Sequence, residues 1–473
     1  MAIGRMPGAR QEELFIAASA VGALDNPFYE ALDKLLRERG FDGFAEDTCR
    51  EFYAERLGRP GLAPGVYFRM LMVGYLEGIG SERGIAWRCR DSISLREFLG
   101  YGLVKAPPEH STLSKTRKRL SLEAHGAVFG WVLEVLRESG LLRGKTVGVD
   151  STTLEANAAM RAIVRRDDGT EYDAWLEQLA RASGIETPRR RDLAKMDRKR
   201  PKKGSNKEWK HPHDPEARIT KMKDGRTRLA HKLEVGVDME TGAVAGVTVQ
   251  TMDGGESASM PVTLDETERR LAEVGAEPKE VVADKGYHSN ATMTGVKERG
   301  QRSYVSEPNR GRRKWKGQRD AQKATYGNRR RIKGERGKRL LRQRAEKLER
   351  TFAHLLGSGG MRRVHLHGQE EIRKRMLLQA AAFNLGLLMR SRFGVGTPRS
   401  LQGLATAATA LADASARSLA ASIGQIRRIL GLLSLHTGSL RPSGRPSYNK
   451  TTLTRPPPFI KPARWQTTSS TAC

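Results

Sequence analysis

The chain has 473 residues, with 84 Lys and Arg against 54 Asp and Glu, so its formal net charge is +30. This length suffices for two or three domains with a substantial core, and the charge attracts polyanions, above all nucleic-acid phosphates. We expect neither a signal peptide nor a membrane span, since the longest uncharged apolar stretch, about residues 376–389, is too short to cross a bilayer. The three scattered cysteines, Cys49, Cys89 and Cys473, argue against a disulfide scaffold and suit a reducing cytoplasm.

Apolar residues at helical spacing predict that residues 1–142 are helical. Ser111 is placed to cap a basic helix at residues 112–119. A run of short helices with one basic member is typical of a helix-turn-helix-like DNA-binding module, whereas a helical bundle with a solvated charged face is the plainer alternative. The other predicted helices cover residues 14–20, 28–36, 66–79, 85–90, 95–101 and 124–136, and the candidate DNA contacts on the basic helix are Lys115, Arg117, Lys118 and Arg119.

The pattern changes to strands at Lys145, where an apolar run leads to Asp150. About seventy polar and basic residues with little periodicity follow, at about 156–226. Beyond them we predict strands at 229–238 and 243–250 joined by a turn, a helix at 260–274, a strand ending at Asp284, a helix at 291–299, a strand at 302–305, and a long basic segment leading into a helix with Glu349. This element order predicts an α/β class with a ribonuclease-H-like core, in which helices flank a mixed five-stranded sheet.

The C-terminal segment, residues 393–473, differs in composition from the rest. Residues 401–435 are rich in Ala, Leu and Ser and predict a helix. From Thr437 the chain is rich in Ser, Thr, Pro and Arg, which is typical of disorder.

Three acidic residues stand where a metal-dependent nuclease of this fold needs them. The first and fourth strands are neighbours, so Asp150 and Asp284 at their ends should meet, and a later helix should present Glu349 beside them. Carboxylates are the ligands that Mg²⁺ and Mn²⁺ prefer, and phosphoryl transfer commonly uses two such ions. Each aspartate could instead be a simple turn residue. Asp238 also ends a strand, but a hairpin-turn role suits it better.

Helical geometry favours Glu349 over its neighbour Glu346. The apolar residues of this helix form one face, and Glu349 lies about 70° from the centre of that face, whereas Glu346 lies about 130° away. The flank position can reach a cleft, and the other points towards solvent.

Basic residues concentrate in two stretches. Residues 310–350 hold 18 Lys and Arg against 4 acids, and residues 189–228 hold 16 against 6. Such runs are usually solvated, but here one adjoins Glu349 and the other lies between the aspartates, so both could hold DNA phosphates. Trp209 and Trp315 could stack on a base or pack locally, and His231-Lys232 is a weaker candidate for touching substrate. The candidate DNA contacts in the first stretch are Arg329, Arg330, Arg331, Arg342 and Arg344, the last two facing the scissile phosphate.

Several motifs are shared with a known family. They are Val147-Gly-Val-Asp150-Ser-Thr-Thr153, Asp214-Pro-Glu-Ala-Arg218, Ala283-Asp284-Lys-Gly-Tyr287, and the stretch from Glu349-Arg-Thr-Phe-Ala-His-Leu355 through residues 360–365 to residues 383–386. Over about residues 60–392 the chain resembles the DDE transposases of bacterial insertion sequences, in the branch related to the group numbered eleven-eighty-two. The resemblance implies that Asp150, Asp284 and Glu349 are the catalytic triad.

The resemblance also implies the partners and the domains. It implies two Mg²⁺ ions, with Mn²⁺ as a substitute, and a homodimer that synapses double-stranded transposon ends and target DNA in the cytoplasm, at the nucleoid. Residues 1–142 would bind the terminal inverted repeats, residues 143–392 would form the catalytic domain, and residues 393–473 the tail. Three departures concern the accessory residues. Four residues rather than three separate Arg344 from Glu349, Leu341 stands at the tyrosine position, and no lysine stands seven residues after Glu349.

We therefore predict a transposase that cuts and joins DNA. The alternatives are a non-catalytic DNA-binding protein or repressor derived from a transposase, and a ribonuclease-H-like nuclease or junction resolvase. A membrane-surface protein is a more distant alternative.

Overall fold

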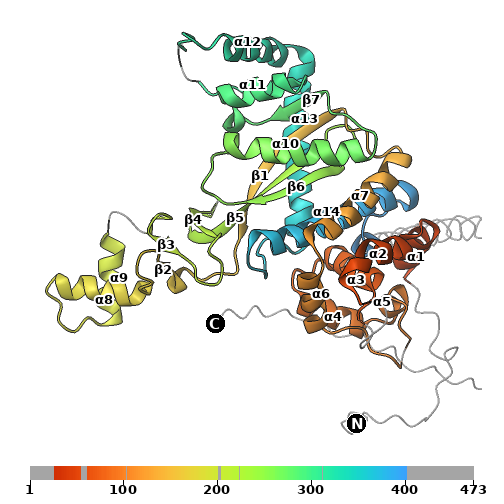
Figure 1. Ribbon diagram of the computed structural model, residues 1–473, viewed down its shortest axis with the longest axis horizontal. Coiled ribbons are helices and arrows are strands. Elements are labelled where there is room, and N and C mark those ends of the chain that lie inside the picture. Colours follow the sequence, from red (N-terminus) through yellow and green to blue (C-terminus); the bar gives the residue numbers. More distant parts are fainter. Residues whose placement is uncertain are drawn as a thin grey trace, which may run out of the picture. The chain divides into compact units, whose positions relative to one another are not determined.

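The computed structural model describes residues 26–54, 61–102, 104–200, 204–222, 224–309, 311 and 313–401 (Figure 1). The predicted helix at residues 14–20, nearly all of the one at 401–435, and the segment from Thr437 lie outside the described residues. Within the described part, no helix is both long enough and apolar enough to cross a membrane.

The described part of residues 1–142 is helical, as predicted. The central helix α3 is buried on almost all sides, because its sequence is apolar around its whole circumference. The basic helix α6 begins two residues earlier than expected, and its N-cap is Glu109 rather than Ser111, so the predicted cap is wrong. The helices are α1 (Pro27–Glu38), α2 (Phe41–Cys49), the short 3₁₀-helix Arg50–Phe52, α3 (Pro64–Glu77), α4 (Glu82–Asp91), α5 (Ile93–Phe98), α6 (His110–Arg119) and α7 (Leu122–Glu138).

A mixed sheet forms the centre of the remaining chain and confirms the predicted fold class. Its order is β6-β5-β1-β7-β8, with β7 parallel to β1 and β8, and β5 antiparallel to β1 and β6. A sixth strand, β4, was not predicted, and it pairs with the first residues of β5. The strands are β1 (Thr146–Glu155), β4 (Arg218–Lys221), β5 (Thr227–Asp238), β6 (Val244–Gln250), β7 (Glu280–Ala283) and β8 (Arg302–Val305).

Strand β1 extends beyond the point that the sequence suggested. We expected it to end at Asp150, but it continues along β5 to Glu155. The parallel pairing with β7, however, stops at Val149 and Ala283. Asp150 therefore lies where the sheet loses its parallel neighbour rather than at the end of its own strand.

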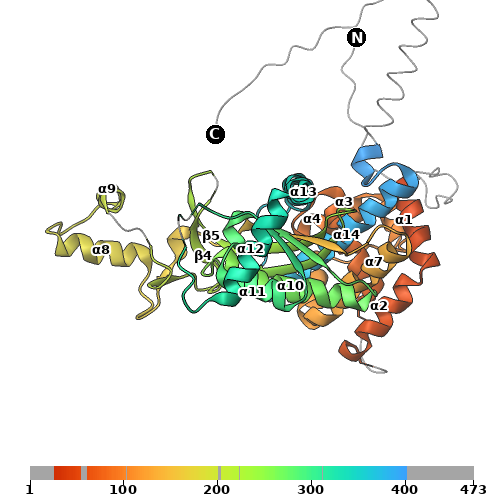
Figure 2. The same cartoon turned by 90° about the horizontal axis from the view of Figure 1, so that it is seen from above.

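Helices cover both faces of the sheet (Figure 2). On one face α13 crosses β1, β7 and β8, and Leu348 approaches so closely that a Cβ at Gly148 would lie 3.1 Å from its Cδ1. On the other face α10 packs against β5 and β6. The helices of this part are α10 (Glu256–Glu273), the 3₁₀-helix η4 (Lys285–Tyr287), α11 (Asn290–Glu298), α12 (Arg319–Lys333), α13 (Glu335–Phe352) with its π-helical extension Ala353–Ser358, and α14 (Gln369–Phe393).

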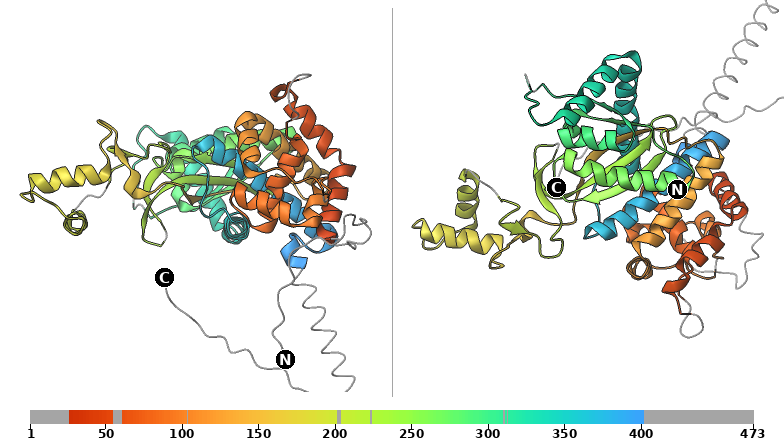
Figure 3. Two further views of the ribbon diagram at one scale, coloured as in Figure 1. Left: turned by 90° about the horizontal axis from the view of Figure 1, so that it is seen from below. Right: turned by 45° about the horizontal axis from the view of Figure 1, so that its top comes forward.

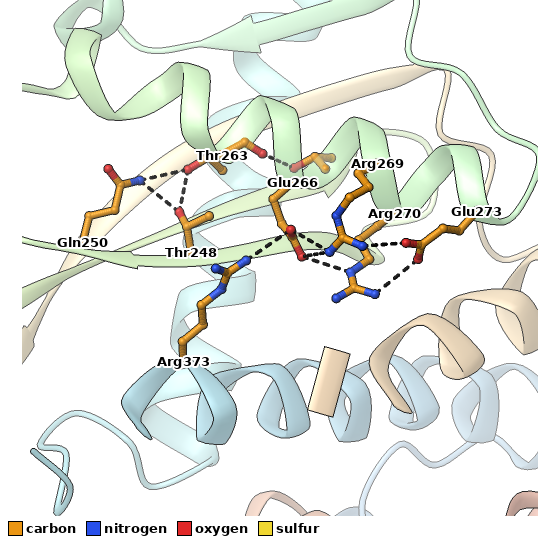
Figure 4. A network of polar contacts seen from close by, with 9 residues as sticks. Thr248, Gln250, Thr263, Glu266, Arg269, Arg270, Glu273 and Arg373 are labelled. Atoms are coloured by element: carbon orange, nitrogen blue, oxygen red, sulfur yellow. Dashed lines mark hydrogen bonds and ion pairs between the residues drawn. The ribbon is translucent and has the colours of Figure 1, made fainter. Parts of the chain in front are cut away.

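Helix α14 joins the sheet to the N-terminal helices. It contacts α7, α3 and β6, and one continuous cluster of buried apolar side chains runs through all of them. A polar network adds to this contact, in which the buried Glu266 of α10 binds Arg269, Arg270 and, from α14, Arg373 (Figure 4). The network links α10 to α14, so the helices on this side of the sheet are held by charge as well as by apolar packing.

The connection between β1 and β5, where we expected little regular structure, contains a small folded insertion (Figures 1 and 3). Trp209 is 1% exposed and packs edge-on against Tyr172 and Trp175. Of the two alternatives for Trp209, local packing is confirmed, and the buried indole is not available to stack on a base. The elements are a 3₁₀-helix (Met160–Ala162), the paired strands β2 (Val164–Arg165) and β3 (Trp209–Lys210), and the neighbouring helices α8 (Tyr172–Ala182) and α9 (Arg190–Lys199).

Candidate active site

Asp150 lies on β1 with its side chain on the α13 face of the sheet. Residues two apart on a strand share a face, and Gly148 faces Leu348 of α13. One carboxylate oxygen accepts a hydrogen bond from the backbone N–H of Ser151 (2.8 Å), and the other accepts one from Arg344 of α13 (2.9 Å). Burial raises the pKa of Asp150 above its ordinary value, although Arg344 opposes this, and the charge of Asp284 raises it further. The carboxylate is therefore only partly stabilised by its surroundings.

Asp284 follows β7 directly and caps the 3₁₀-turn that ends at Tyr287. Its Oδ1 accepts a hydrogen bond from the backbone N–H of Lys285 (2.6 Å) and lies 3.8 Å from a guanidinium nitrogen of Arg344. Because Val149 pairs with Ala283, the residues that follow them, Asp150 and Asp284, are carried to the same place. The structure thus brings both aspartates to one arginine, and the side chain of Asp284 remains 47% exposed.

Glu349 lies on the exposed surface of α13. It follows Arg344 by five residues, which places it about 140° around the helix from the arginine that meets the aspartates. In the described residues no group of three or more His, Cys, Asp and Glu is close enough to hold a metal ion. The structure therefore brings Asp150 and Asp284 together without Glu349. The competing Glu346 is also exposed and pairs with Arg350.

Glu256, which sequence reasoning missed, packs on the turn that follows Asp284 and feels the charge of both aspartates. It stands in the first turn of α10, and its carboxylate packs so tightly on the turn after Asp284 that a Cβ at Gly286 would lie 1.5 Å from Oε2. Burial raises the pKa of Glu256; Lys232 opposes the shift, and Asp150 and Asp284 add to it. The helix was expected to begin only at Met260, so this acid was assigned to a loop. The available signal was an acidic residue at the start of the helix that follows β6, the third strand predicted from the sequence.

The His231-Lys232 pair, a weak candidate for touching substrate, is directed inward. His231 Nε2 lies 2.9 Å from an oxygen of Asp214, and both side chains are fully buried. Lys232 is also buried and donates a hydrogen bond to Ser259 of α10 (2.7 Å). Asp214 further accepts the backbone N–H of Gly368, so its motif ties the insertion to the start of α14. The substrate-contact hypothesis is wrong for both residues in this structure.

The nine arginines and lysines expected to contact DNA divide into two groups. Arg117 is buried and forms ion pairs with Glu82 and Glu371, so the expectation that it contacts DNA is wrong. Arg329 and Arg331 bind Glu307 and the backbone oxygen of Ser303, and Arg344 binds the aspartates. The exposed members are Lys115, Lys118, Arg119, Arg330 and Arg342.

Trp315, the second aromatic candidate, is half-buried on the surface beside α12. The guanidinium of Arg313 lies 4.5 Å from its ring centroid, and the ring of Tyr326 lies 6.1 Å away. Local packing thus engages Trp315 as well, and its contact with a base remains a prediction.

Comparison with known families decides the identity. Residues 163–385 match the model of the transposase DDE domain, and residues 21–119 match a second model, described as Transposase domain (DUF772). The chain belongs to the DDE transposases of insertion sequences. This confirms the predicted function, an enzyme that cuts DNA and transfers its strands, and nothing in the structure favours the repressor or resolvase alternatives.

The match to the DDE domain does not cover the whole site. It includes Asp284 and Glu349 but begins after Asp150. The models also do not distinguish between branches of insertion sequences, so the eleven-eighty-two group stays a prediction. No curated protein matches the chain.

Proposed function

We propose that this transposase cuts and joins DNA at the sheet edge that carries Asp150 and Asp284, with Glu349 as the third carboxylate. The observation that carries the proposal is the placement of Arg344, whose guanidinium contacts both aspartates. A positive charge is therefore already accommodated between two carboxylates, at a place where one of them is half exposed.

The residues present fit divalent cations. They supply hard oxygen ligands, which Mg²⁺ and Mn²⁺ prefer. Asp150 faces both Asp284 and Arg344, so it suits the role of a ligand shared by two ions. Two Mg²⁺ ions bound here would activate the attacking oxygen and stabilise the leaving oxygen. Three carboxylates leave one positive charge on such a pair, which a DNA phosphate would balance.

Glu349 has the freedom that this role requires. It is exposed on α13, on the side of the helix away from Lys347, which donates to the backbone oxygen of Glu240 at the β5–β6 turn. Glu349 lies about 160° around the helix from Lys347, so it projects away from that turn. The turn is at the end of the sheet where β1 begins, because the backbone N–H of Met239 donates a hydrogen bond to the carbonyl oxygen of Thr146. Glu349 also lies about 140° around the helix from Arg344, so the proposal requires α13 to turn or shift when metal ions and DNA bind.

Exposed cations on the same chain suit the DNA backbone. Lys115, Lys118 and Arg119 extend from α6, and Arg330 and Arg342 from α12 and α13. We assign the first group to phosphates of the transposon end and the second to DNA at the site, because such contacts position a duplex without reading its sequence. A homodimer holding two ends would give the synaptic complex that transposition requires.

The reaction needs no protein nucleophile. Water attacks the phosphodiester at the transposon end, and the bond to the 3′-oxygen breaks to free a 3′-hydroxyl. That hydroxyl attacks a target phosphodiester, and the displaced target oxygen leaves with the proton. The protein positions the phosphate in line with the attacking oxygen and supplies the carboxylate oxygens that would bind the metal ions.

The test is cleavage of a duplex taken from the DNA that flanks the gene, in the presence of Mg²⁺. We expect Asp150→Asn, Asp284→Asn and Glu349→Gln each to lower the cleavage rate by about a thousandfold or more, since metal ligation supplies several kcal/mol to the transition state. Glu346→Gln, on the same helix, is the matched control and should cleave within about twofold of the unmodified protein. Full activity of the three variants would overturn the site, and loss in Glu346→Gln with activity in Glu349→Gln would reassign the third acid.

A further inference from the structure

Glu234 is a wholly buried carboxylate beside the candidate active site. It lies on β5, and three hydroxyl groups donate hydrogen bonds to it. Ser259 (2.9 Å) and Thr263 (2.5 Å) come from α10, and Tyr287 (2.7 Å) comes from the turn after Asp284. A buried carboxylate without partners would cost several kcal/mol, so these donors, together with the buried ammonium of Lys232 at 3.8 Å, are what allow Glu234 to remain there.

Tyr287 connects this buried group to Asp284. Its side chain is fully buried at the end of the three-residue turn that Asp284 caps. Burial, together with the charge of Glu234, holds the pKa of Tyr287 well above its ordinary value, so the phenol stays protonated and donates. The turn therefore cannot shift without moving the Tyr287–Glu234 hydrogen bond.

The same pair also reaches the strand that carries Asp150. Glu234 is the direct partner of Ser151 across the β1–β5 ladder, and Ser151 follows Asp150. A hydrogen-bond interaction with the Ser151 side chain also reaches the phenol of Tyr287 and partly opposes the rise of its pKa. Glu234 and Tyr287 thus lie where the two chain segments with the aspartates meet, on the α10 face of the sheet, opposite Arg344.

We propose that Glu234 and Tyr287 are positioning residues that set the separation of Asp150 and Asp284 for divalent cations. The inference rests on the proposed function. β7 is only four residues long and its pairing with β1 stops before either aspartate, so that pairing alone does not fix Asp284 relative to Asp150, which β5 holds in register. Substituting a group that orients a metal ligand typically costs about 10–100-fold in metal affinity or activity.

The close approach of Glu256 supports the same role. Its carboxylate occupies the space beside Gly286 that any larger residue would need. Two features therefore hold the turn: Glu256 packs closely against it because Gly286 has no side chain, and Tyr287 ties it to Glu234 by a hydrogen bond. This accounts for the Gly-Tyr sequence directly after Asp284-Lys285.

The alternative is that Tyr287 only stabilises the fold, and the chain offers a matched control for it. Tyr304 is also buried and also donates to a buried carboxylate, Glu280 (3.2 Å), but at the end of the sheet where β7 begins. Tyr287→Phe and Tyr304→Phe each remove one hydroxyl from a buried Tyr–Glu pair. They differ in their distance from the aspartates.

The experiment measures cleavage of the end-bearing duplex against Mg²⁺ concentration, with thermal unfolding of each protein without metal. We expect a similar drop in melting temperature for both variants. Tyr287→Phe should raise the Mg²⁺ concentration for half-maximal cleavage about tenfold or more, while the rate at saturating Mg²⁺ falls less. Tyr304→Phe should give the Mg²⁺ curve of the unmodified protein.

Glu234→Gln provides a second reading if Tyr287→Phe folds poorly. The amide keeps an acceptor for the phenol and should shift the Mg²⁺ curve in the same direction by less. The inference is overturned if Tyr287→Phe and Glu234→Gln keep the unmodified curve, or if Tyr304→Phe shifts it equally. Asp284→Asn distinguishes a failure of this inference from a failure of the proposed function, because full activity of that variant would show that the active site does not include Asp284.

Discussion

Helix α13 carries an arginine to each end of the central sheet, and the two ends satisfy their carboxylates to different degrees. Where β1 and β7 begin, Arg336 binds the buried Glu280, which also accepts hydrogen bonds from Thr146 (2.8 Å) and Tyr304 (3.2 Å). Burial would raise the pKa of Glu280, but these partners outweigh it and lower the pKa. The first end is thus a closed, fully partnered site.

At the other end, Arg344 serves two carboxylates at once. Asp150 and Asp284 share its guanidinium, at 2.9 and 3.8 Å, and Glu256 adds a third acid nearby. Burial raises the pKa of Asp150, so a single arginine does not offset the cost of its charge. This end therefore carries an excess of negative charge.

The difference separates a structural ion pair from a site with capacity for a ligand. Both ends use an arginine of the same helix, eight residues apart, and both use carboxylates near β1 and β7. What differs is the number of donors for each acid. A carboxylate with all its donors in place gains little from a cation, whereas one that shares its partner gains a great deal.

The largest expected effect contrasts the two arginines. Arg344→Gln should lower the cleavage rate about a hundredfold or more, which corresponds to about 2.7 kcal/mol, because the residue lies between the aspartates and would face the scissile phosphate. Arg336→Gln should cleave within about twofold of the unmodified protein, measured at one temperature where both are folded. Equal losses in the two variants would remove the distinction between the ends.

Stability should change in opposite directions when the two acids are neutralised. Glu280→Gln should lower the free energy of unfolding by about 1–3 kcal/mol, because hydrogen bonds to a charged group are lost. Asp150→Asn should leave it unchanged or raise it by at most about 1 kcal/mol, as expected of a residue kept for function at a cost to stability. Urea unfolding without divalent ions measures both, and a large loss in Asp150→Asn would contradict the comparison.

The smallest expected effect is on the pH dependence of stability. The folded pKa of Glu280 is lowered, so its contribution is complete above its ordinary value of 4.5 and is lost as the pH falls through the lowered value. The folded pKa of Asp150 is raised, so its ionisation weakens the fold increasingly as the pH rises from 3.8 through the raised value.

Unfolding free energies between pH 3 and 7, without divalent ions, test these two signs. Glu280→Gln should flatten the loss of stability in acid, and Asp150→Asn should make stability rise more steeply with pH. The same change of slope in both variants would show that the ends are alike.

Local patterns in the sequence predicted five of the six strands of the central sheet, all but β4, and their order along the chain. The strand at Arg302–Val305 and the hairpin of β5 and β6 follow from alternation and turn residues, which act over a few positions. Asp238 has the turn role expected of it, since it accepts hydrogen bonds from Glu240 and Thr241. That order also predicted that β1 and β7 are neighbours in the sheet, and they pair in parallel.

The errors concern residues whose partners are distant in sequence. Arg117 looked like a DNA contact until Glu371, 254 residues away, was seen to bind it. For Trp209 the sequence left stacking on a base and local packing both open, and the structure shows that Tyr172 and Trp175 enclose it. Charge and composition predict the average environment of a segment, and they do not identify which single side chain turns inward.

The amino-acid sequence alone determined the class of fold, the DNA-directed charge, and the two aspartates placed after apolar runs. Only the tertiary structure decided that Arg344 lies between those aspartates, that Glu256 packs on the turn after Asp284, and that Tyr287 fastens this turn to Glu234. The reason is physical: strand alternation and helical spacing arise from bonds between near neighbours. Shared ion pairs and buried hydrogen bonds depend instead on how separate elements are packed together.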